Sequence, residues 1–274
     1  MGNQEVIKLR KNGYSLREIS KSLEISIKKV RKACLGIHMS KKGLKRHSQL
    51  NGVTRKIVFK DELNEAKVRI ISNLIFDGGV YKSREYHYTM MYVNSSKGLI
   101  RQFLQDMKTT YNIKPSTFDS FENYQRVTYY SKIIYIDLLK YCKSYSTSNN
   151  ICSIPNEVMS GDEPYKVIIL RSFWENEGSI SFKGRLMADL KSLKVINQLS
   201  MLHDEFNLKH KIIRYRSNGW MHKLYLYKTK DNYVTFWRLG LFSKANVTRG
   251  YNRGMKKSDV LERYIQKKFR LKIN

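Results

Sequence analysis

Apolar residues recur at helical spacing in two stretches of the chain that end in the same way. Residues 70–78 read IISNLIFDG and residues 170–178 read LRSFWENEG, so each apolar run leads to a carboxylate followed by glycine. The two acids, Asp77 and Glu177, are 100 positions apart. Apolar side chains three and four residues apart form one buried helix face, and a glycine marks the end of a helix. The pattern predicts one structural unit that is used twice.

The segments after the two acids repeat the same order of predicted elements. Each acid is followed by two strand-like segments, a helix, further strand-like sequence and a second helix. In the first half the strands are expected near 80–82, 85–93 and 125–130; in the second they are expected near 179–182, 185–190, 211–216 and 220–228. Lys132 and Lys230 begin the later helices, 55 and 53 positions beyond the acids. We therefore predict an α+β fold of two pseudo-symmetric αββαββα halves, residues 61–150 and 151–274.

The N-terminal residues show a different pattern, with three short helices predicted in residues 5–36. Ser15 and Glu18 form the S-x-x-E box that caps a helix, and Ser26 caps the next one, with Ile27, Val30 and Ala33 facing inward. This segment resembles a helix-turn-helix of the homeodomain-like or resolvase-like kind. We predict a domain at 1–40 followed by a basic linker at 41–60. A three-helix module for protein contact is the alternative.

The charge of the chain changes the picture, because it points to a polyanionic partner. Lys and Arg number 52 against 23 Asp and Glu, a net charge of +29, and the sequence pI is about 10.0. Such a surplus favours nucleic acid, although solubility or an anionic membrane surface would also explain it. The sequence has no apolar run long enough to span a bilayer and no signal peptide, so we expect a soluble, intracellular protein. Three cysteines without C-x-x-C spacing indicate neither a disulfide framework nor a zinc site.

The two acidic motifs, with the following strands and lysines, resemble the paired motifs of the monomeric LAGLIDADG homing endonucleases. The resemblance covers residues 61–240 and implies a DNA-binding saddle with the two motif helices side by side at its centre. It implies that Asp77 and Glu177 bind Mg²⁺ or Mn²⁺, and that Lys132 and Lys230 are candidate catalytic residues. The position before each acid, small in the family, is Phe76 in the first motif and Asn176 in the second.

The chemistry of phosphodiester cleavage gives these acids a physical role. Hydrolysis builds negative charge on phosphate oxygens, and hard divalent ions held by carboxylates neutralise it. A carboxylate at a helix C-terminus meets an unfavourable dipole, so a bound cation would relieve a local cost. The alternative is that Asp77 and Glu177 are ordinary polar helix caps. For the lysines, the alternative is that they are solvated charges, and Lys228 competes with Lys230 for the same role.

DNA contacts are expected from the third helix and from the strands of both halves. Basic side chains on a groove-facing helix reach phosphates and bases, and alternate residues of a strand form one exposed face. Tyr88 and Tyr92 are expected in the core. The candidate DNA-binding residues are Lys28, Lys29, Arg31, Lys32, Arg84, His87, Arg126, Lys183, Arg185, Arg214, Arg216 and Lys223.

These observations favour a site-specific endonuclease that cuts both strands of duplex DNA and acts as a monomer. A DNA-binding transcriptional regulator that uses the same saddle and helix-turn-helix without cleavage is the first alternative. RNA binding in intron splicing is the second, and it fits a helix-turn-helix less well. An acid at the end of both motifs favours cleavage over either alternative.

Overall fold

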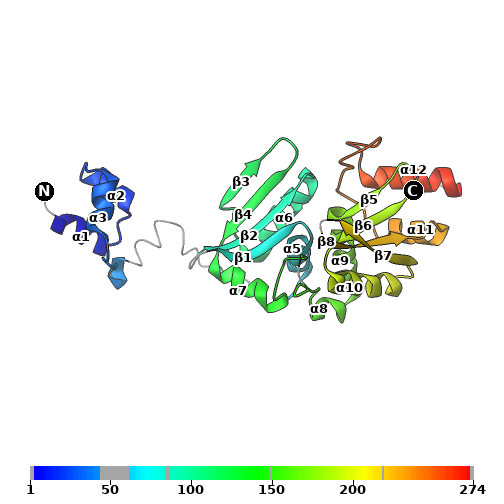
Figure 1. Ribbon diagram of the computed structural model, residues 1–274, viewed down its shortest axis with the longest axis horizontal. Coiled ribbons are helices and arrows are strands. Elements are labelled where there is room, and N and C mark those ends of the chain that lie inside the picture. The colour runs from blue at the N-terminus through cyan, green and yellow to red at the C-terminus, as the bar shows by residue number, and fades with distance from the viewer. Residues whose placement is uncertain (1–2, 44–61, 84–86, 149, 218, 272–274) are drawn as a thin grey trace. The chain divides into compact units, whose positions relative to one another are not determined.

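The computed structural model describes residues 3–43, 62–83, 87–148, 150–217 and 219–271 (Figure 1). The chain divides into two compact units, Met1–Ile57 and Val58–Asn274. Most of the linker expected at 41–60 lies outside the described residues, and the proposed domain limits stay a prediction. None of the helices among the described residues is long and apolar enough to cross a membrane.

The smaller unit contains three short helices, as the N-terminal pattern predicts: α1 (Asn3–Lys11), α2 (Leu16–Ser22) and α3 (Ile27–Ala33). Their shared core is formed by Val6, Ile19 and Val30. The predicted caps are present, because Ser15 and Glu18 form a reciprocal capping box and the Ser26 side chain accepts a hydrogen bond from the backbone of α3. The inward orientation predicted for Ile27 is wrong: the residue is 37% exposed, since it is the first residue of α3 and lies outside the shared core.

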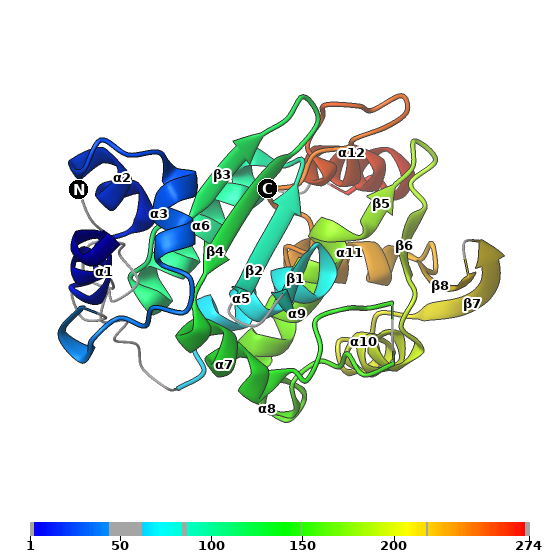
Figure 2. The ribbon, with the colours of Figure 1, turned by 60° about the vertical axis from the view of Figure 1, so that its left-hand side comes forward.

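The larger unit holds two successive sets of helices and strands (Figures 1 and 2). The first set comprises α5 (Glu65–Phe76), β1 (Gly78–Ser83), β2 (His87–Asn94), α6 (Lys97–Tyr111), β3 (Thr117–Ser120), β4 (Gln125–Tyr130) and α7 (Lys132–Tyr141). The second comprises α8 (Asn156–Met159), α9 (Glu163–Asn176), β5 (Gly178–Ile180), β6 (Leu186–Leu190), α10 (Leu193–Glu205), β7 (His210–Ser217), β8 (Gly219–Leu226), α11 (Lys230–Arg238) and α12 (Lys257–Phe269).

The two halves have the same topology, which confirms the predicted α+β fold. Each contains a four-stranded antiparallel sheet, ordered β1-β2-β4-β3 in the first half and β5-β6-β8-β7 in the second. The register also repeats, because Gly78 pairs with Tyr92 and Gly178 pairs with Ala188 directly after each acid. The short elements β3 and α8 were not given ranges by the sequence, since four residues carry little periodic signal.

The two motif helices, α5 and α9, pack against each other at the centre of the larger unit. Ser72 and Ser172 are buried on these helices, where small side chains allow close approach. Phe76 does not prevent this packing: its ring lies 5.5 Å from that of Phe173, centroid to centroid. The pair therefore brings the C-terminal ends of two helices, and the acids that follow them, to the middle of the fold.

The glycine after each acid is required by close approach of the backbone. A Cβ atom on Gly78 would lie 2.7 Å from the carbonyl oxygen of Met91, and one on Gly178 would collide with the carbonyl oxygen and indole ring of Trp174. Real Cβ atoms do not approach other atoms this closely. The acid–glycine pairs noted in the sequence thus mark tight helix-to-strand junctions in both halves.

Candidate active site at the paired helix ends

Asp77 and Glu177 occupy equivalent positions at the helix-to-strand junctions. Each is the C-terminal cap of its motif helix: the Asp77 amide donates to the Asn73 carbonyl at 3.0 Å, and the Glu177 amide donates to the Phe173 carbonyl at 2.9 Å. Both side chains are partly buried. Glu177 lines a cleft of about 650 Å³ together with Phe76, Gly78 and Asp189. The folding of the two motifs thus places one carboxylate at the C-terminal end of each of two packed helices.

Burial raises the pKa of both carboxyl groups and so favours their protonated forms. It raises the pKa of Asp77 to about 6, although a hydrogen bond from Asn94 and the charge of Lys257 act in the other direction. Burial also raises the pKa of Glu177 to about 8, and the negative charges of Asp77 and Asp189 raise it further. The two acids therefore lie within each other's field. A cation placed between them would remove this repulsion and favour the ionised forms.

Four side chains connect Asp77 to the opposite motif helix. Asn94 donates from Nδ2 to Asp77 Oδ2 at 2.7 Å and to Asn176 Oδ1 at 2.9 Å. The Tyr92 hydroxyl also donates to Asn176 Oδ1, at 2.8 Å, and Asn176 Nδ2 donates to Asn73 Oδ1 at 2.9 Å. Asn176, the residue before the acid of the second motif, is therefore the centre of a hydrogen-bond network between α5 and α9.

Lys257, the first residue of α12, stabilises the end of the second motif helix. Its buried ammonium donates to the carbonyls of Glu175 at 2.8 Å and Gly178 at 2.6 Å. A cation at a helix C-terminus complements the helix dipole. Burial lowers the pKa of Lys257 to about 8, while Glu175, Asp77 and Glu177 act to raise it. The lysine thus supplies positive charge beside the paired acids.

The two carboxylates suit a hard divalent ion. Mg²⁺ commonly takes one or two protein carboxylates and completes its shell with water and substrate phosphates. Among the described residues, no group of three or more His, Cys, Asp or Glu side chains could hold a metal ion. Two partly buried acids at neighbouring helix ends therefore match a site that would bind Mg²⁺ or Mn²⁺ together with a phosphate-bearing ligand.

No hydrogen bond or ion pair joins Lys132 or Lys230 to Asp77 or Glu177 among the described residues, and the role predicted for the two lysines stays a prediction. The backbone amide of Ser131 donates to the Tyr88 carbonyl, whereas the Asp77 carbonyl accepts from Val93, five residues further along the same strand. Five strand residues span about 17 Å. The Lys132 ammonium lies 5.8 Å over the Tyr88 ring. Lys230 is exposed and begins α11, six residues after Leu224, which pairs with Ala188 beside Glu177. Lys228, the competing lysine, donates to the Lys183 carbonyl at 2.9 Å.

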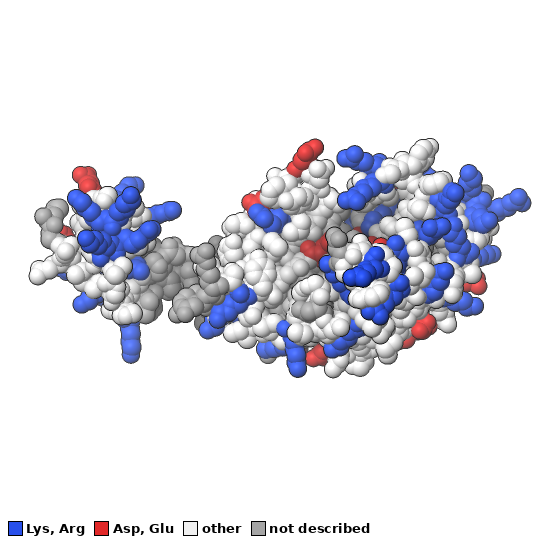
Figure 3. Space-filling view, viewed as in Figure 1, with Lys and Arg blue, Asp and Glu red and all other residues white. Residues whose placement is uncertain are grey.

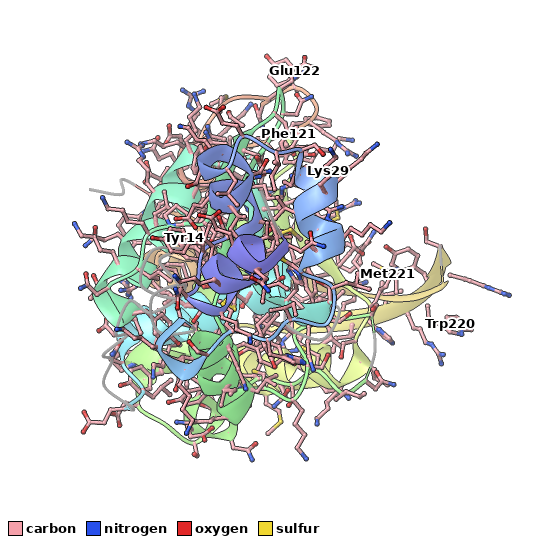
Figure 4. The ribbon with its side chains drawn as sticks, turned by 90° about the vertical axis from the view of Figure 1, so that its left-hand side faces the viewer. Tyr14, Lys29, Phe121, Glu122, Trp220 and Met221 are labelled. Atoms are coloured by element: carbon pink, nitrogen blue, oxygen red, sulfur yellow. The ribbon has the colours of Figure 1, made fainter. Side chains whose placement is uncertain are left out.

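The predicted DNA-binding residues of the smaller unit are all solvent-exposed. Lys28, Lys29, Arg31 and Lys32 lie on α3 around the buried Val30. Figure 4 shows Lys29 pointing outward from this helix. The exposed basic face is therefore available, as the sequence predicts, while its use in binding stays a prediction.

The predicted strand residues fall on more than one face. Arg214 and Arg216 pair with His222 and Trp220, whereas Lys223 pairs with Ile213 on the opposite face of the same hairpin. The Arg214 guanidinium lies 3.8 Å from the centre of the Trp220 ring, and Trp220 extends from the β7–β8 hairpin in Figure 4. Strand alternation thus divides residues that the sequence grouped together.

The remaining predicted residues differ in how available their charges are. Arg126 forms a salt bridge with Asp119 at 2.9 Å, which neutralises its charge. His87, Lys183 and Arg185 are exposed. Arg84 lies outside the described residues. Among the predicted residues that the structure describes, the second half therefore holds the exposed cations Lys183 and Arg185, whereas the first half holds the ion-paired Arg126.

The fold of the chain is similar to those of several solved structures. The sequence matches no protein-family model and no curated protein. A structure of I-DmoI in complex with DNA and Mn is similar at a TM-score of 0.51 and 15% identity, over 65% of this chain and 97% of that chain. Mesophilic variants of the homing endonuclease I-DmoI match equally well, at a TM-score of 0.51 and 15% identity over 64% and 94% of the two chains. About two thirds of the chain has a LAGLIDADG-type fold.

A third similar structure is the N-terminal LAGLIDADG domain of DUF199/WhiA, at a TM-score of 0.45 and 18% identity over 68% of this chain and 87% of that chain. The LAGLIDADG-type fold places α5 and α9 as the paired central helices, in agreement with the architecture expected from the two motifs. At this level of identity the likeness concerns the fold. The activity has to be argued from the site.

Sequence reasoning missed Asn94, Lys257 and Asp189, which surround the two acids. Asn94 ends a strand and Lys257 begins a helix, so neither interrupts a periodic pattern. Asp189 lines the same cleft as Glu177, accepts a hydrogen bond from the Tyr215 hydroxyl at 2.8 Å and lies 3.5 Å from the Lys223 ammonium. The one available signal was the acid in an otherwise apolar strand, LMADL.

Proposed function

We propose that this protein is a divalent-metal-dependent endonuclease that cuts both strands of duplex DNA. The observation that carries the proposal is the pair of partly buried acids, Asp77 and Glu177, at the ends of two packed helices. The LAGLIDADG-type fold and the net charge of +29 support DNA as the substrate. One acid in each pseudo-symmetric half suits a duplex, whose two strands are themselves related by a two-fold axis.

The residues of the site would act mainly by holding charge. Asp77 and Glu177 would bind Mg²⁺ or Mn²⁺, which when bound supplies Lewis-acid stabilisation of the phosphate. Asn94 orients the Asp77 carboxylate, and Lys257 keeps the end of α9 in place beside Glu177. Lys132 and Lys230 remain proposed members of the site only if the DNA complex brings them closer than they are here.

The sheets would hold the DNA above these acids. Figure 3 shows Lys and Arg gathered over the second half, with fewer over the sheet of the first half. The exposed cations of the β5–β8 sheet, with those of α3 in the smaller unit, would contact phosphates and bases. We propose that the protein acts as a monomer, because the chain itself supplies both halves of the saddle.

The decisive experiment is incubation of the protein with a randomised duplex library and Mg²⁺ or Mn²⁺, followed by sequencing of cut ends. We expect cleavage at a specific site by the wild type. Asp77→Asn and Glu177→Gln should each reduce cleavage by at least about 10³-fold while binding in Ca²⁺ persists, because each removes charge that would hold the metal. Unchanged cleavage by both variants would refute the assignment of the acids.

If cleavage is absent, the alternative function is that of a DNA-binding regulator. Tight, sequence-specific binding without cut ends in any metal would replace the endonuclease proposal with that one. Preference for RNA over the same duplex sequence would favour the splicing alternative. The library experiment with a matched RNA pool therefore separates all three functions.

The smaller unit would add a second DNA contact through α3. Deletion of residues 1–40 should weaken DNA binding and reduce its salt dependence, since each lost phosphate contact removes about 0.9 from the slope of log affinity against log salt. The salt slope is measured by titration at several ionic strengths. A slope identical to that of the full chain would show that this unit does not bind DNA.

A further inference from the structure

Asp77 and Glu177 occupy equivalent positions but have different surroundings. Asp77 accepts a hydrogen bond from Asn94, which in turn donates to Asn176 in the other half. The register of the sheets identifies the corresponding residues near Glu177: Leu190 is the equivalent of Asn94, and Phe76 is the equivalent of Asn176. Leucine and phenylalanine side chains carry no hydrogen-bond donor. The pseudo-two-fold symmetry of the site is therefore broken in its polar contacts.

Backbone groups fix the orientation of both amides in the network. The Ser96 amide donates to Asn94 Oδ1 at 2.7 Å, so the Asn94 NH₂ group must face Asp77 and Asn176. Asn176 Nδ2 donates to the Ser172 carbonyl at 2.7 Å, so Asn176 Oδ1 must face Asn94. A backbone amide can only donate and a backbone carbonyl can only accept. The direction of each hydrogen bond thus follows from the fold.

All the hydrogen-bonding capacity of Asn176 is used. Its Oδ1 accepts from Tyr92 and Asn94, and its Nδ2 donates to Asn73 and Ser172. Asn73, Asn94 and Tyr92 are buried. A fully satisfied buried network is rigid, and removal of one member leaves the others without partners. Asn176 therefore restricts Asn94, and Asn94 restricts the carboxylate of Asp77.

We propose that Asn176 is a positioning residue for Asp77, so that the motif helix of the second half orients the acid of the first half, while Glu177 receives no such support. The two acids then form unequal metal-binding positions. Metal binding at these acids rests on the proposed function. The Asp77 position is preorganised and binds the ion more tightly, and the Glu177 position is filled at higher metal concentration.

The test measures metal binding by itself, with Tb³⁺ as a hard, oxygen-seeking probe and tryptophan-sensitised luminescence as the readout. The wild-type chain should bind Tb³⁺ in two steps, with Asp77→Asn removing the tighter step and Glu177→Gln the weaker one. Asn176→Leu, which keeps the branching of asparagine at Cγ but carries no polar atoms, should weaken the tighter step by about 10–100-fold, the usual effect of a residue that orients a metal ligand. The weaker step should be unchanged.

Two further variants separate positioning from general structure. Asn94→Leu copies the second half, where Leu190 stands, and should make the two binding steps nearly equal. Tyr92→Phe removes a hydroxyl that bonds Asn176 but leaves Asn94 in contact with Asp77, and should change the tighter step by less than about 3-fold. Circular dichroism and a cooperative thermal transition establish that each variant is folded.

The outcomes decide between this proposal and the proposed function. Equal weakening of both steps by a folded Asn176→Leu variant, or no effect of Asn176→Leu and Asn94→Leu, would overturn the positioning role. Failure of the wild type to bind Tb³⁺ at these acids would also overturn it. Two unequal steps in a protein that cuts no DNA would support the positioning role and remove the endonuclease. If cleavage occurs, Asn176→Leu should slow one strand and accumulate nicked duplex.

Discussion

The two halves of the larger unit share a topology but differ in charge. Residues 61–150 contain 12 Lys and Arg against 9 Asp and Glu, a net charge of +3, whereas residues 151–274 contain 24 against 11, a net charge of +13. The aromatic residues at the tips of the β3–β4 and β7–β8 hairpins also differ in the charged residue beside them. In the first half the β3–β4 tip holds Phe121 and Glu122, and Phe121 stacks on Tyr124 (Figure 4). In the second, Trp220 stacks on Arg214.

The surroundings of the two acids differ as well. Asp77 accepts a hydrogen bond from an amide, whereas Glu177 lies in the field of the buried Lys257 ammonium, and its carboxylate accepts no hydrogen bond from any of the described residues. A repeated fold thus does not imply repeated function. If both proposals hold, the first half supplies a preorganised acid and the second supplies most of the positive charge that attracts DNA.

The largest expected effect is on DNA binding, because the second half carries most of the net positive charge of the larger unit. Replacement of Arg214 and Arg216, which share one face of the β7–β8 hairpin, by alanine should weaken duplex binding by about 10²-fold at moderate salt and lower the salt slope by up to about 1.8, as two phosphate contacts are lost. A matched variant of the first half, Lys82→Ala with Arg126→Ala, should change binding by less than about 10-fold. Fluorescence anisotropy across a salt series measures both. Equal effects of the two sets would refute this division of charge between the halves.

The next effect concerns the tight junctions, which the two halves share. Gly178→Ala should lower the free energy of unfolding by about 2–4 kcal/mol, because the added methyl group collides with the carbonyl and ring of Trp174. Gly78→Ala should lower the free energy of unfolding by a similar amount. Gly79→Ala is the control, since its Cβ would first meet the Tyr81 ring at 3.6 Å. Urea denaturation measures all three, and equal stability of the Gly178 and Gly79 variants would show that the junction relaxes.

A smaller effect should separate the two acids by pH. The folded-state pKa of Glu177, about 8, is above the ordinary 4.5 of glutamate, so the fold favours its protonated form. The resulting stabilisation is complete below pH 4.5 and is lost as pH rises through 8. Glu177→Gln removes this loss and should raise the free energy of unfolding at pH 9 by about 2 kcal/mol or more in EDTA. At pH 4 the two proteins should be similar.

Asp77 should show the same behaviour over a lower and narrower range of pH. Its pKa rises only from 3.8 to about 6, so Asp77→Asn should gain less stability than Glu177→Gln, and the gain should be complete by about pH 7. Urea denaturation of both variants at pH 4, 7 and 9 measures the difference. A larger gain for Asp77→Asn would reverse the order of the two acids.

Local sequence was sufficient for the elements and for the placement of the two acids. The capping residues Ser15, Ser26, Ser131 and Thr229 each bond a backbone amide three residues ahead, so their effect can be recognised within one turn. The acid–glycine pairs end two helices of strong apolar periodicity, and the repeat follows from their spacing. These features depend on neighbours a few positions away.

Only the tertiary structure decided which residues surround the acids. Asn94 and Asn176 are 82 positions apart, and Lys257 and Gly178 are 79 apart, so no local spacing predicts their contact. Long-range packing also placed Lys132 beside Tyr88, and the register of the β7–β8 hairpin put Arg214 and Lys223 on opposite faces. The sequence determined that each half ends its motif helix in an acid. The tertiary structure decided that the two acids are not equivalent, because Asp77 accepts a hydrogen bond from Asn94 of its own half, and Asn94 is in turn bonded to Asn176 across the contact between the halves.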